Sequence, residues 1–391
     1  MNALINKLSS LVIFRNLLSD GIIQSMARML EFEDATEQEI IYNYCEFAHK
    51  LFSSTTCISD YILNAALDDE NIYIKHKLQG AGDNVFFEQM LDRELDILKE
   101  VSLFDGKIIR EKIVSVELPV WNVKDHDLKA LYSERIANIN TRGFGIYARH
   151  KMFVLDDEGR ILPIKNPDRI CLDDLIGYER ERGIVLDNTL AFLNNKNANN
   201  VLLYGDAGTG KSSTVKALVN SLYDKGLRLI EFKKDQLEFI PRIIEELSDN
   251  PLKFIFFIDD LTFASDDNNF SALKATLEGG VCGRGHNILI YATSNHRHMI
   301  KESASARQDS VNVADALEES TSLSARFGIT VTYLNCDREL FRRILTELAL
   351  KNGISASADE LVIGGEAFAL RGGGRNPRTA KQYIDMLGAK K

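Results

Sequence analysis

One stretch of the chain combines glycines, a lysine and hydroxyl side chains in a spacing suited to binding phosphate. Residues 205–212 read Gly-Asp-Ala-Gly-Thr-Gly-Lys-Ser and follow the apolar run 201–204. In this Gly-x-x-x-x-Gly-Lys-Ser pattern, the glycines let backbone N–H groups point into one concavity that holds a phosphate. Lys211 would add a cation for the β- and γ-phosphates, and the Ser212 hydroxyl could ligate Mg²⁺. The predicted nucleotide-binding residues of this loop are Gly205, Asp206, Ala207, Gly208, Thr209, Gly210, Lys211, Ser212 and Ser213.

Two adjacent carboxylates follow a second apolar run, 254–258. Beside a phosphate loop, Asp259 would hold Mg²⁺, directly or through water, and Asp260 could orient or deprotonate the attacking water. Asp260 is one methylene shorter than the glutamate often found in this role, which bears on hydrolysis rather than on nucleotide binding. The alternative is a solvated strand end with no role in chemistry.

A polar segment also follows the apolar run 287–292. Its Asn295 could hydrogen-bond the attacking water or the γ-phosphate, although an asparagine here is also a common turn residue. His296 and His298 have the spacing of metal ligands, but no third ligand is evident nearby, which favours a chance pair.

Strands and helices alternate from about residue 170 onward, which predicts an α/β domain with a parallel sheet covered on both faces. The phosphate loop would then lie at the carboxyl end of the first strand, where such sheets bind ligands. The predicted strands are 201–204, 227–232, 253–258, 287–292 and 329–334. The predicted helices are 212–224, 237–247, 270–278, 337–350 and 376–387.

The first part of the chain differs from this pattern. Its apolar spacing is helical up to about residue 105, and the stretch 145–165 predicts a β-hairpin with its turn at 156–159. We therefore expect three domains. They are a mainly helical domain with the hairpin at 1–166, an α/β nucleotide-binding core at 167–335 and a small helical lid at 336–391.

Composition and charge narrow the range of partners. Residues 1–100 hold 8 Lys and Arg against 17 Asp and Glu, which accounts for most of the net charge of −10. This acidic region argues against broad binding to a nucleic-acid backbone. No apolar run approaches the length of a membrane span, and the start of the chain does not resemble a signal peptide. The five cysteines lack Cys-x-x-Cys spacing, so we expect reduced thiols in a cytoplasmic protein.

The order of these motifs resembles that of AAA+ ATPases, and more closely that of the bacterial DUF815 family of predicted AAA+ ATPases. The resemblance covers roughly residues 165–388. Besides the phosphate loop, it is carried by the segments Leu-Asp-Asp-Leu-Ile-Gly at 172–177, Ile-Asp-Asp-Leu at 258–261, Tyr-Ala-Thr-Ser-Asn-His-Arg-His at 291–298 and Ser-Ala-Arg-Phe-Gly at 324–328. It implies a P-loop NTPase of AAA+ type with ATP and Mg²⁺ as ligands.

The resemblance also implies roles for single residues. Lys211 with Ser212 would be Walker A, Asp259 with Asp260 Walker B, and Asn295 sensor 1. Arg326 looks like an arginine finger that acts on a neighbouring subunit in a homo-oligomer. Arg378 looks like sensor 2 on the lid, and Ile176 with Gly177 resembles the segment that lines the adenine pocket. The sequence departs from the family where Ala264 stands in place of a frequent glutamate and where Pro377 adjoins Arg378.

These observations predict an ATPase that couples its nucleotide state to a protein partner whose identity the sequence does not give. One alternative is a nucleotide-gated adaptor with little turnover, which Ala264 and the short acid Asp260 favour. Another is a DNA-acting loader or motor, which the acidic N-terminal region disfavours. A small-molecule kinase is least favoured because no separate acceptor-binding motif is visible.

Overall fold

The computed structural model describes residues 2–33, 35–80, 84–261, 273–274, 277, 286–295 and 326–389. The chain divides into two compact units, Met1–Arg149 and His150–Lys391. The sequence-based boundary at 166/167 therefore falls inside the second unit. None of the helices in the described part of the chain combines the length and the apolar character needed to cross a membrane.

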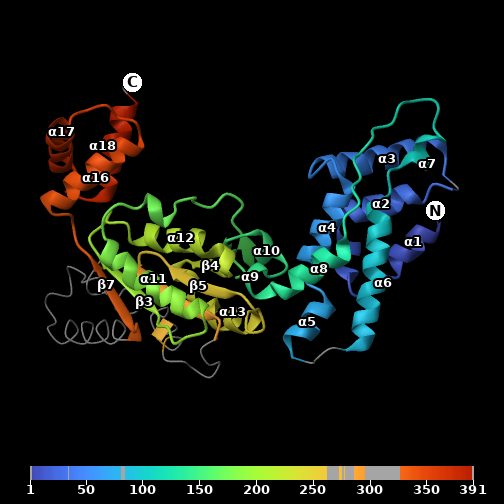
Figure 1. The fold of residues 1–391 in the computed structure, drawn as a ribbon, viewed down its shortest axis with the longest axis horizontal. Coiled ribbons are helices and arrows are strands. Elements are labelled where there is room, and N and C mark those ends of the chain that lie inside the picture. Colours follow the sequence, from blue (N-terminus) through green and yellow to red (C-terminus); the bar gives the residue numbers. More distant parts are fainter. Residues whose placement is uncertain are drawn as a thin grey trace. The chain divides into compact units, whose positions relative to one another are not determined.

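The first unit is helical, as its apolar spacing predicts (Figure 1). Its helices are α1 (Asn2–Ser9), the 3-10 helix η1 (Arg15–Ser19), α2 (Gly21–Leu30), α3 (Glu37–Phe52), α4 (Ile58–Asp68), α5 (Ile72–Leu78), α6 (Val85–Ser102), α7 (Lys107–Arg110), α8 (Leu128–Ala137), α9 (Ile139–Arg142) and α10 (Ile146–Arg149).

Aromatic packing and a buried carboxylate organise the core of this first unit. The rings of Tyr44 and Phe47 on α3 lie 5.0 and 4.9 Å from that of Trp121, the only tryptophan of the chain. Glu94 on α6 is buried, and its carboxylate accepts backbone N–H bonds from residues 12, 13 and 14 at 2.9–3.1 Å. These bonds satisfy a charge that burial would otherwise penalise, so the turn after α1 is fixed against α6.

The second unit contains a seven-stranded sheet in the order β2-β1-β4-β5-β6-β3-β7. Its strands are β1 (Met152–Leu155), β2 (Ile161–Pro163), β3 (Val201–Gly205), β4 (Leu227–Phe232), β5 (Lys253–Ile258), β6 (Ile288–Ser294) and β7 (Ile329–Tyr333). Only the β1–β2 pair is antiparallel. The five strands predicted after residue 170 are confirmed almost to the residue.

The hairpin is confirmed, but it belongs to the sheet of the second unit. Its first strand β1 pairs in parallel with β4, so that Phe153 lies opposite Ile230. Residues 146–149, expected to extend this strand, form the helix α10 instead. Its second strand β2 forms one edge of the sheet and ends in Pro163, which has no backbone N–H to donate.

The helices of the second unit are the 3-10 helices η2 (Leu172–Asp174), η3 (Tyr223–Lys225) and η4 (Lys234–Phe239), and the α-helices α11 (Glu179–Leu193), α12 (Lys211–Leu222), α13 (Ile240–Glu246), α16 (Arg338–Lys351), α17 (Ala358–Arg371) and α18 (Pro377–Gly388). Apolar residues of α11 and α12 pack on one face of the sheet and form a continuous core with it. The helices α16, α17 and α18, which follow β7, enclose a second core (Figure 1). The helix expected at 270–278 lies largely outside the described residues.

The fold class predicted from the sequence is therefore confirmed. The second unit is an α/β domain with a mainly parallel sheet and a helical C-terminal part, and the first unit is helical.

Candidate functional site

The phosphate loop joins the end of β3 to the start of α12. Its glycines Gly205, Gly208 and Gly210 have φ angles of 130°, 79° and 96°, which residues with a Cβ rarely adopt. A Cβ on Gly205 would also overlap the carbonyl of Tyr333 on the neighbouring strand β7. The glycines are thus required by the path of the backbone, which turns directly into the N-terminus of α12. The free N–H groups and the dipole at that helix end favour an anion.

The Lys211 ammonium lies beneath this loop and has three acceptors. Its Nζ donates to the carbonyls of Gly205 and Asp206, both at 2.8 Å, and to Asn295 Oδ1 at 2.9 Å. The residue is only 5% exposed. Burial lowers the pKa of Lys211 below its ordinary value, while the carboxylates of Asp206, Asp260 and Asp259 oppose that shift. A phosphate arriving at this loop would meet a cation that is already positioned and partly desolvated.

The order of the strands brings the predicted polar groups together. Strand β6 lies between β3 and β5, with Leu203 opposite Thr293 and Ile258 opposite Ala292. The carboxyl ends of all three strands therefore meet at one edge of the sheet. The residues that follow β5 and β6 consequently face the start of α12.

The two acids of this edge have different partners. Asp259 Oδ1 accepts hydrogen bonds from Ser212 Oγ and Thr293 Oγ1, both at 2.6 Å. Asp260 adopts a left-handed backbone conformation with a φ of 52°, and its Oδ1 accepts from Asn295 Nδ2 at 2.8 Å. The Asn295 amide thus bridges the Lys211 ammonium and the Asp260 carboxylate.

These residues line a cavity of about 840 Å³ within the second unit. Among the residues predicted from the sequence, those that line it are Ile176, Ala207, Gly208, Thr209, Gly210, Lys211, Ser212, Ser213, Asp259, Asp260, Asn295 and Arg378. The predicted residues Gly177, Gly205 and Asp206 do not line it. Its volume falls within the range of small-molecule and cofactor sites.

The donor set suits a nucleoside triphosphate with Mg²⁺. The Ser212 hydroxyl and the Asp259 carboxylate could both bind Mg²⁺ through oxygen, and they are hydrogen-bonded to each other. Mg²⁺ is usually held by one or two protein oxygens together with phosphate oxygens rather than by a closed protein cage. The left-handed glycines and the buried ammonium provide the matching cradle for the phosphates.

The helices α16, α17 and α18 form the part of the chain predicted as the lid, and they contact the phosphate loop through the N-terminus of α18. The Arg378 backbone N–H donates to the carbonyl of Gly208 at 3.2 Å, and the Arg378 side chain lines the cavity. Asn376 caps this helix by accepting from the N–H of Thr379 at 2.9 Å. Because Pro377 occupies the first turn of the helix, where no internal N–H bond is needed, it is compatible with this arrangement.

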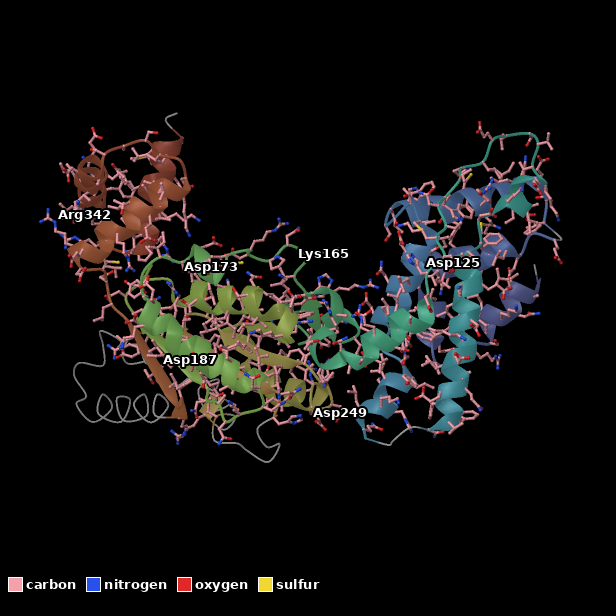
Figure 2. The ribbon with its side chains drawn as sticks, in the orientation of Figure 1. Asp125, Lys165, Asp173, Asp187, Asp249 and Arg342 are labelled. Atoms are coloured by element: carbon pink, nitrogen blue, oxygen red, sulfur yellow. The ribbon has the colours of Figure 1, made fainter. Side chains whose placement is uncertain are left out.

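A second connection between sheet and lid forms around the predicted adenine segment. Ile176 is buried in the core of the lid rather than in that of the sheet. Gly177 has a φ of 80°, and a Cβ there would lie 2.9 Å from Leu340 Cδ1 on α16. Asp173 lies on η2 (Figure 2). Its carbonyl accepts a hydrogen bond from Lys351 Nζ at 2.6 Å. The segment 173–177 therefore joins the two cores.

Arg326 is the predicted catalytic residue that does not line this cavity. It immediately precedes the segment that leads into β7, and it is absent from the residues that line the cavity. Ala264, His296 and His298 lie outside the described residues.

Several residues of the cavity were not predicted from the sequence. Thr293 bonds to the acid pair, and the side chains of Tyr178, Arg182 and Lys381 line the walls. Burial lowers the pKa of Arg182, whose guanidinium donates to the carbonyl of Gly177. The position of Thr293, two residues before Asn295 and therefore on the same side of the strand, was a signal that could have identified it.

Comparison with known proteins gives one family match and several structural neighbours. No curated protein matches the chain significantly. The RuvB Holliday junction branch migration motor of Thermotoga maritima is 19% identical, with a TM-score of 0.37, 56% of this chain covered and 66% of that chain. AMPPCP-bound DnaA from Aquifex aeolicus is 16% identical, with a TM-score of 0.41, 57% of this chain covered and 66% of that chain. The chain thus spans slightly less than two thirds of either neighbour.

The family model described as "Protein of unknown function (DUF815)" matches residues 148–391, which include the whole second compact unit. The match therefore covers the sheet, the cavity and the lid together. The chain belongs to the DUF815 family.

Proposed function

We propose that this chain is an ATPase that binds ATP with Mg²⁺ and hydrolyses the γ-phosphate. The observation that carries the proposal is the hydrogen-bonded network at the carboxyl edge of the sheet. In it, Ser212 bonds to Asp259, and Asn295 bonds to both Lys211 and Asp260. A phosphate loop, a magnesium-binding pair and a carboxylate for water are thus connected by side-chain hydrogen bonds.

The residues divide the reaction among themselves. The N–H groups of the loop and the Lys211 ammonium hold the phosphates and stabilise the charge that develops on the transferred group. Ser212 and Asp259 would hold Mg²⁺, which would neutralise phosphate charge. Asp260 accepts a proton from water as the water oxygen bonds to the γ-phosphorus and the bond to the bridging oxygen breaks. The products are ADP and inorganic phosphate.

The lid gives this chemistry a mechanical output. Arg378 bonds to Gly208 through its backbone and lines the cavity with its side chain, so a change at the phosphates alters its surroundings directly. We propose that nucleotide state sets the position of the lid and thereby the affinity for a protein partner. Arg326 does not line its own cavity, and we assign it to the site of a neighbouring copy in a homo-oligomer.

ATP binding and phosphate release in two variants test the proposal. Lys211→Ala should abolish ATP binding, because it removes the cation under the loop. Asp260→Asn should keep binding and lose turnover by about 10²-fold or more, because an amide accepts no proton. Asparagine also tolerates the left-handed backbone at this position. Lys216→Ala, on the same helix but away from the cavity, is the matched control and should leave both properties unchanged.

A wild-type protein that binds no ATP would contradict the proposal as a whole. A second candidate, a nucleotide-gated switch with little turnover, is favoured by the short acid at 260. In that case the wild type would bind ATP, keep it intact for hours and bind its partner differently with ATP and with ADP. Salt-sensitive retention on DNA would instead point to a DNA-acting role.

A further inference from the structure

We infer that Thr293 is a positioning residue that orients both acids of the site and so sets the affinity for the divalent cation. The inference rests on the proposed function, since it concerns the same cavity. Thr293 lies near the end of β6 and is 2% exposed. Its hydroxyl bonds to both Asp259 and Asp260.

The hydrogen bonds of this hydroxyl have a fixed direction. Thr293 Oγ1 lies 2.9 Å from the backbone N of Asp260, where only the N–H can donate. The single hydroxyl hydrogen of Thr293 is therefore available for the Asp259 carboxylate, 2.6 Å away. Rotation of the Thr293 side chain about its Cα–Cβ bond would move this oxygen and break both bonds.

The two bonds have separate consequences. The bond to Asp259 holds the carboxylate oxygen that also accepts from Ser212, so the two magnesium ligands keep one relative geometry. Such hydrogen bonds to a metal ligand commonly contribute 10–100-fold to metal affinity or activity. The bond from the Asp260 N–H stabilises a left-handed backbone, which most residues with a Cβ adopt only at a cost in free energy. Thr293 therefore aims the Asp260 side chain as well.

The backbone of β6 also binds the segment 259–261 at position 293. The carbonyl of Thr293 accepts from the N–H of Leu261 at 2.7 Å. This bond does not depend on the side chain and remains in any variant at position 293. A substitution of the hydroxyl alone therefore leaves the segment 259–261 attached to β6 and changes its orientation.

The test compares Thr293→Val, which keeps the shape and removes the hydroxyl, with Thr293→Ser, which keeps the hydroxyl. The readout is the dissociation constant of a fluorescent, non-hydrolysable ATP analogue, measured with Mg²⁺ and with EDTA. The ratio of the two constants reports the contribution of the cation. We expect Thr293→Val to reduce this ratio by about tenfold or more and Thr293→Ser to keep it within about twofold.

Thr189→Val is the matched control. Thr189 is also fully buried, and its hydroxyl lies 2.8 Å from that of Tyr291 on β6, but it does not line the cavity. Its loss should lower stability and leave the magnesium ratio unchanged. In an Asp259→Asn background, Thr293→Val should cause no further loss of the ratio, because the ligand that it orients has been altered already.

The outcomes separate this inference from the proposed function. A wild type that binds the analogue more tightly with Mg²⁺, together with a Thr293→Val variant of unchanged ratio, overturns only the role of Thr293. Equal losses in Thr293→Val and Thr293→Ser overturn it as well, because the hydroxyl would not be the cause. A wild type that binds no analogue under either condition overturns both.

Discussion

The carboxylate of Asp206 in the phosphate loop accepts a hydrogen bond from the backbone N–H of Asn335 at 2.7 Å. Asn335 belongs to the short segment between β7 and the first lid helix, and the next residue, Cys336, donates its N–H to the carbonyl of Arg375. The loop that would hold the phosphates is thus bonded to the segment that leads from β7 into α16. In the opposite direction, the Asp206 N–H donates to the carbonyl of Tyr333 at 2.8 Å.

This relationship predicts different effects for two substitutions at position 206. Asp206→Ala and Asp206→Asn both remove the charge, but only alanine removes the acceptor for Asn335. We expect Asp206→Ala to weaken ATP binding by about fivefold, equivalent to about 1 kcal/mol, and Asp206→Asn to change it little. The amide hydrogen of Asn335 should exchange faster in the alanine variant alone. Equal exchange rates in the two variants would disprove the coupling.

The glycines of the loop should differ in their tolerance of a methyl group. Gly210→Ala introduces a left-handed alanine into open space, at a cost of about 1–2 kcal/mol. Gly205→Ala adds the overlap with Tyr333, and we expect about 1–3 kcal/mol more destabilisation. Scanning calorimetry of the two variants measures the difference. Similar melting temperatures would show that β7 can move away from β3.

The arginine assignment predicts complementation between inactive variants. Arg326→Ala retains its own cavity, and Lys211→Ala retains the arginine that we assign to its neighbour. An equal mixture should recover roughly a quarter of wild-type turnover if subunits mix at random, because half of the cavities and half of the neighbours are intact. A mixture of Lys211→Ala and Asp260→Asn should recover none, since each lacks a group of its own cavity. Failure of the first mixture would exclude a finger from the neighbouring copy.

A buried carboxyl group in the first unit predicts a pH dependence of stability. Asp69 is 8% exposed, its Oδ2 has no hydrogen-bond partner in the described part of the chain, and burial raises its pKa to about 6. The folded pKa thus lies above the unfolded value of about 3.9. The folded state therefore binds this proton more tightly than the unfolded state does. Protonation of Asp69 contributes its full amount to the free energy of unfolding below about pH 4, and this contribution is lost as the pH rises through about 6.

Asp69→Asn should therefore stabilise the first unit at neutral pH by about 2 kcal/mol and have little effect near pH 4. Urea unfolding followed by the fluorescence of Trp121 reports on this unit, because the chain has no other tryptophan. Asp125→Asn, whose carboxylate is 70% exposed and pairs with Lys99, is the control and should change stability little at either pH. A gain that is independent of pH would contradict the titration of Asp69.

Local sequence patterns predicted the strands well, but they did not predict which strands pair when these lie far apart in the sequence. β5 is apolar at nearly every position and ends at two aspartates, so both its existence and its end could be read from the sequence. The hairpin was also visible, but its place in the sheet depends on a parallel pairing with β4, more than seventy residues away. No local pattern encodes that partner, so the sequence-based boundary at 166/167 separates the hairpin from the sheet to which it pairs.

Helix α17 is absent from the helices predicted from the sequence. It contains Gly364 and Gly365 near its middle, and paired glycines lower the predicted helicity. The structure shows why glycine is needed there. A Cβ on Gly364 would overlap the hydroxyl of Tyr383, and a Cβ on Gly365 would lie 2.5 Å from Leu345 Cδ1. Close packing within the lid overrides the weak intrinsic preference.

In the site, the motif residues were predictable because their spacing is fixed by the chemistry of phosphate and metal. Thr293 and Arg182 were not, because a threonine in a strand and an arginine in a helix have many structural roles. Only the register between β3, β6 and β5 shows that Thr293 meets both acids.

The edge strand β2 has a consequence for solubility. A free sheet edge is a template on which another chain can add a strand, which leads to aggregation. This edge is only three residues long and ends in Pro163, which cannot donate a hydrogen bond to an incoming strand. The strand β2 thus offers few backbone groups with which a strand of another chain could pair. We expect it to protect this edge of the sheet against self-association.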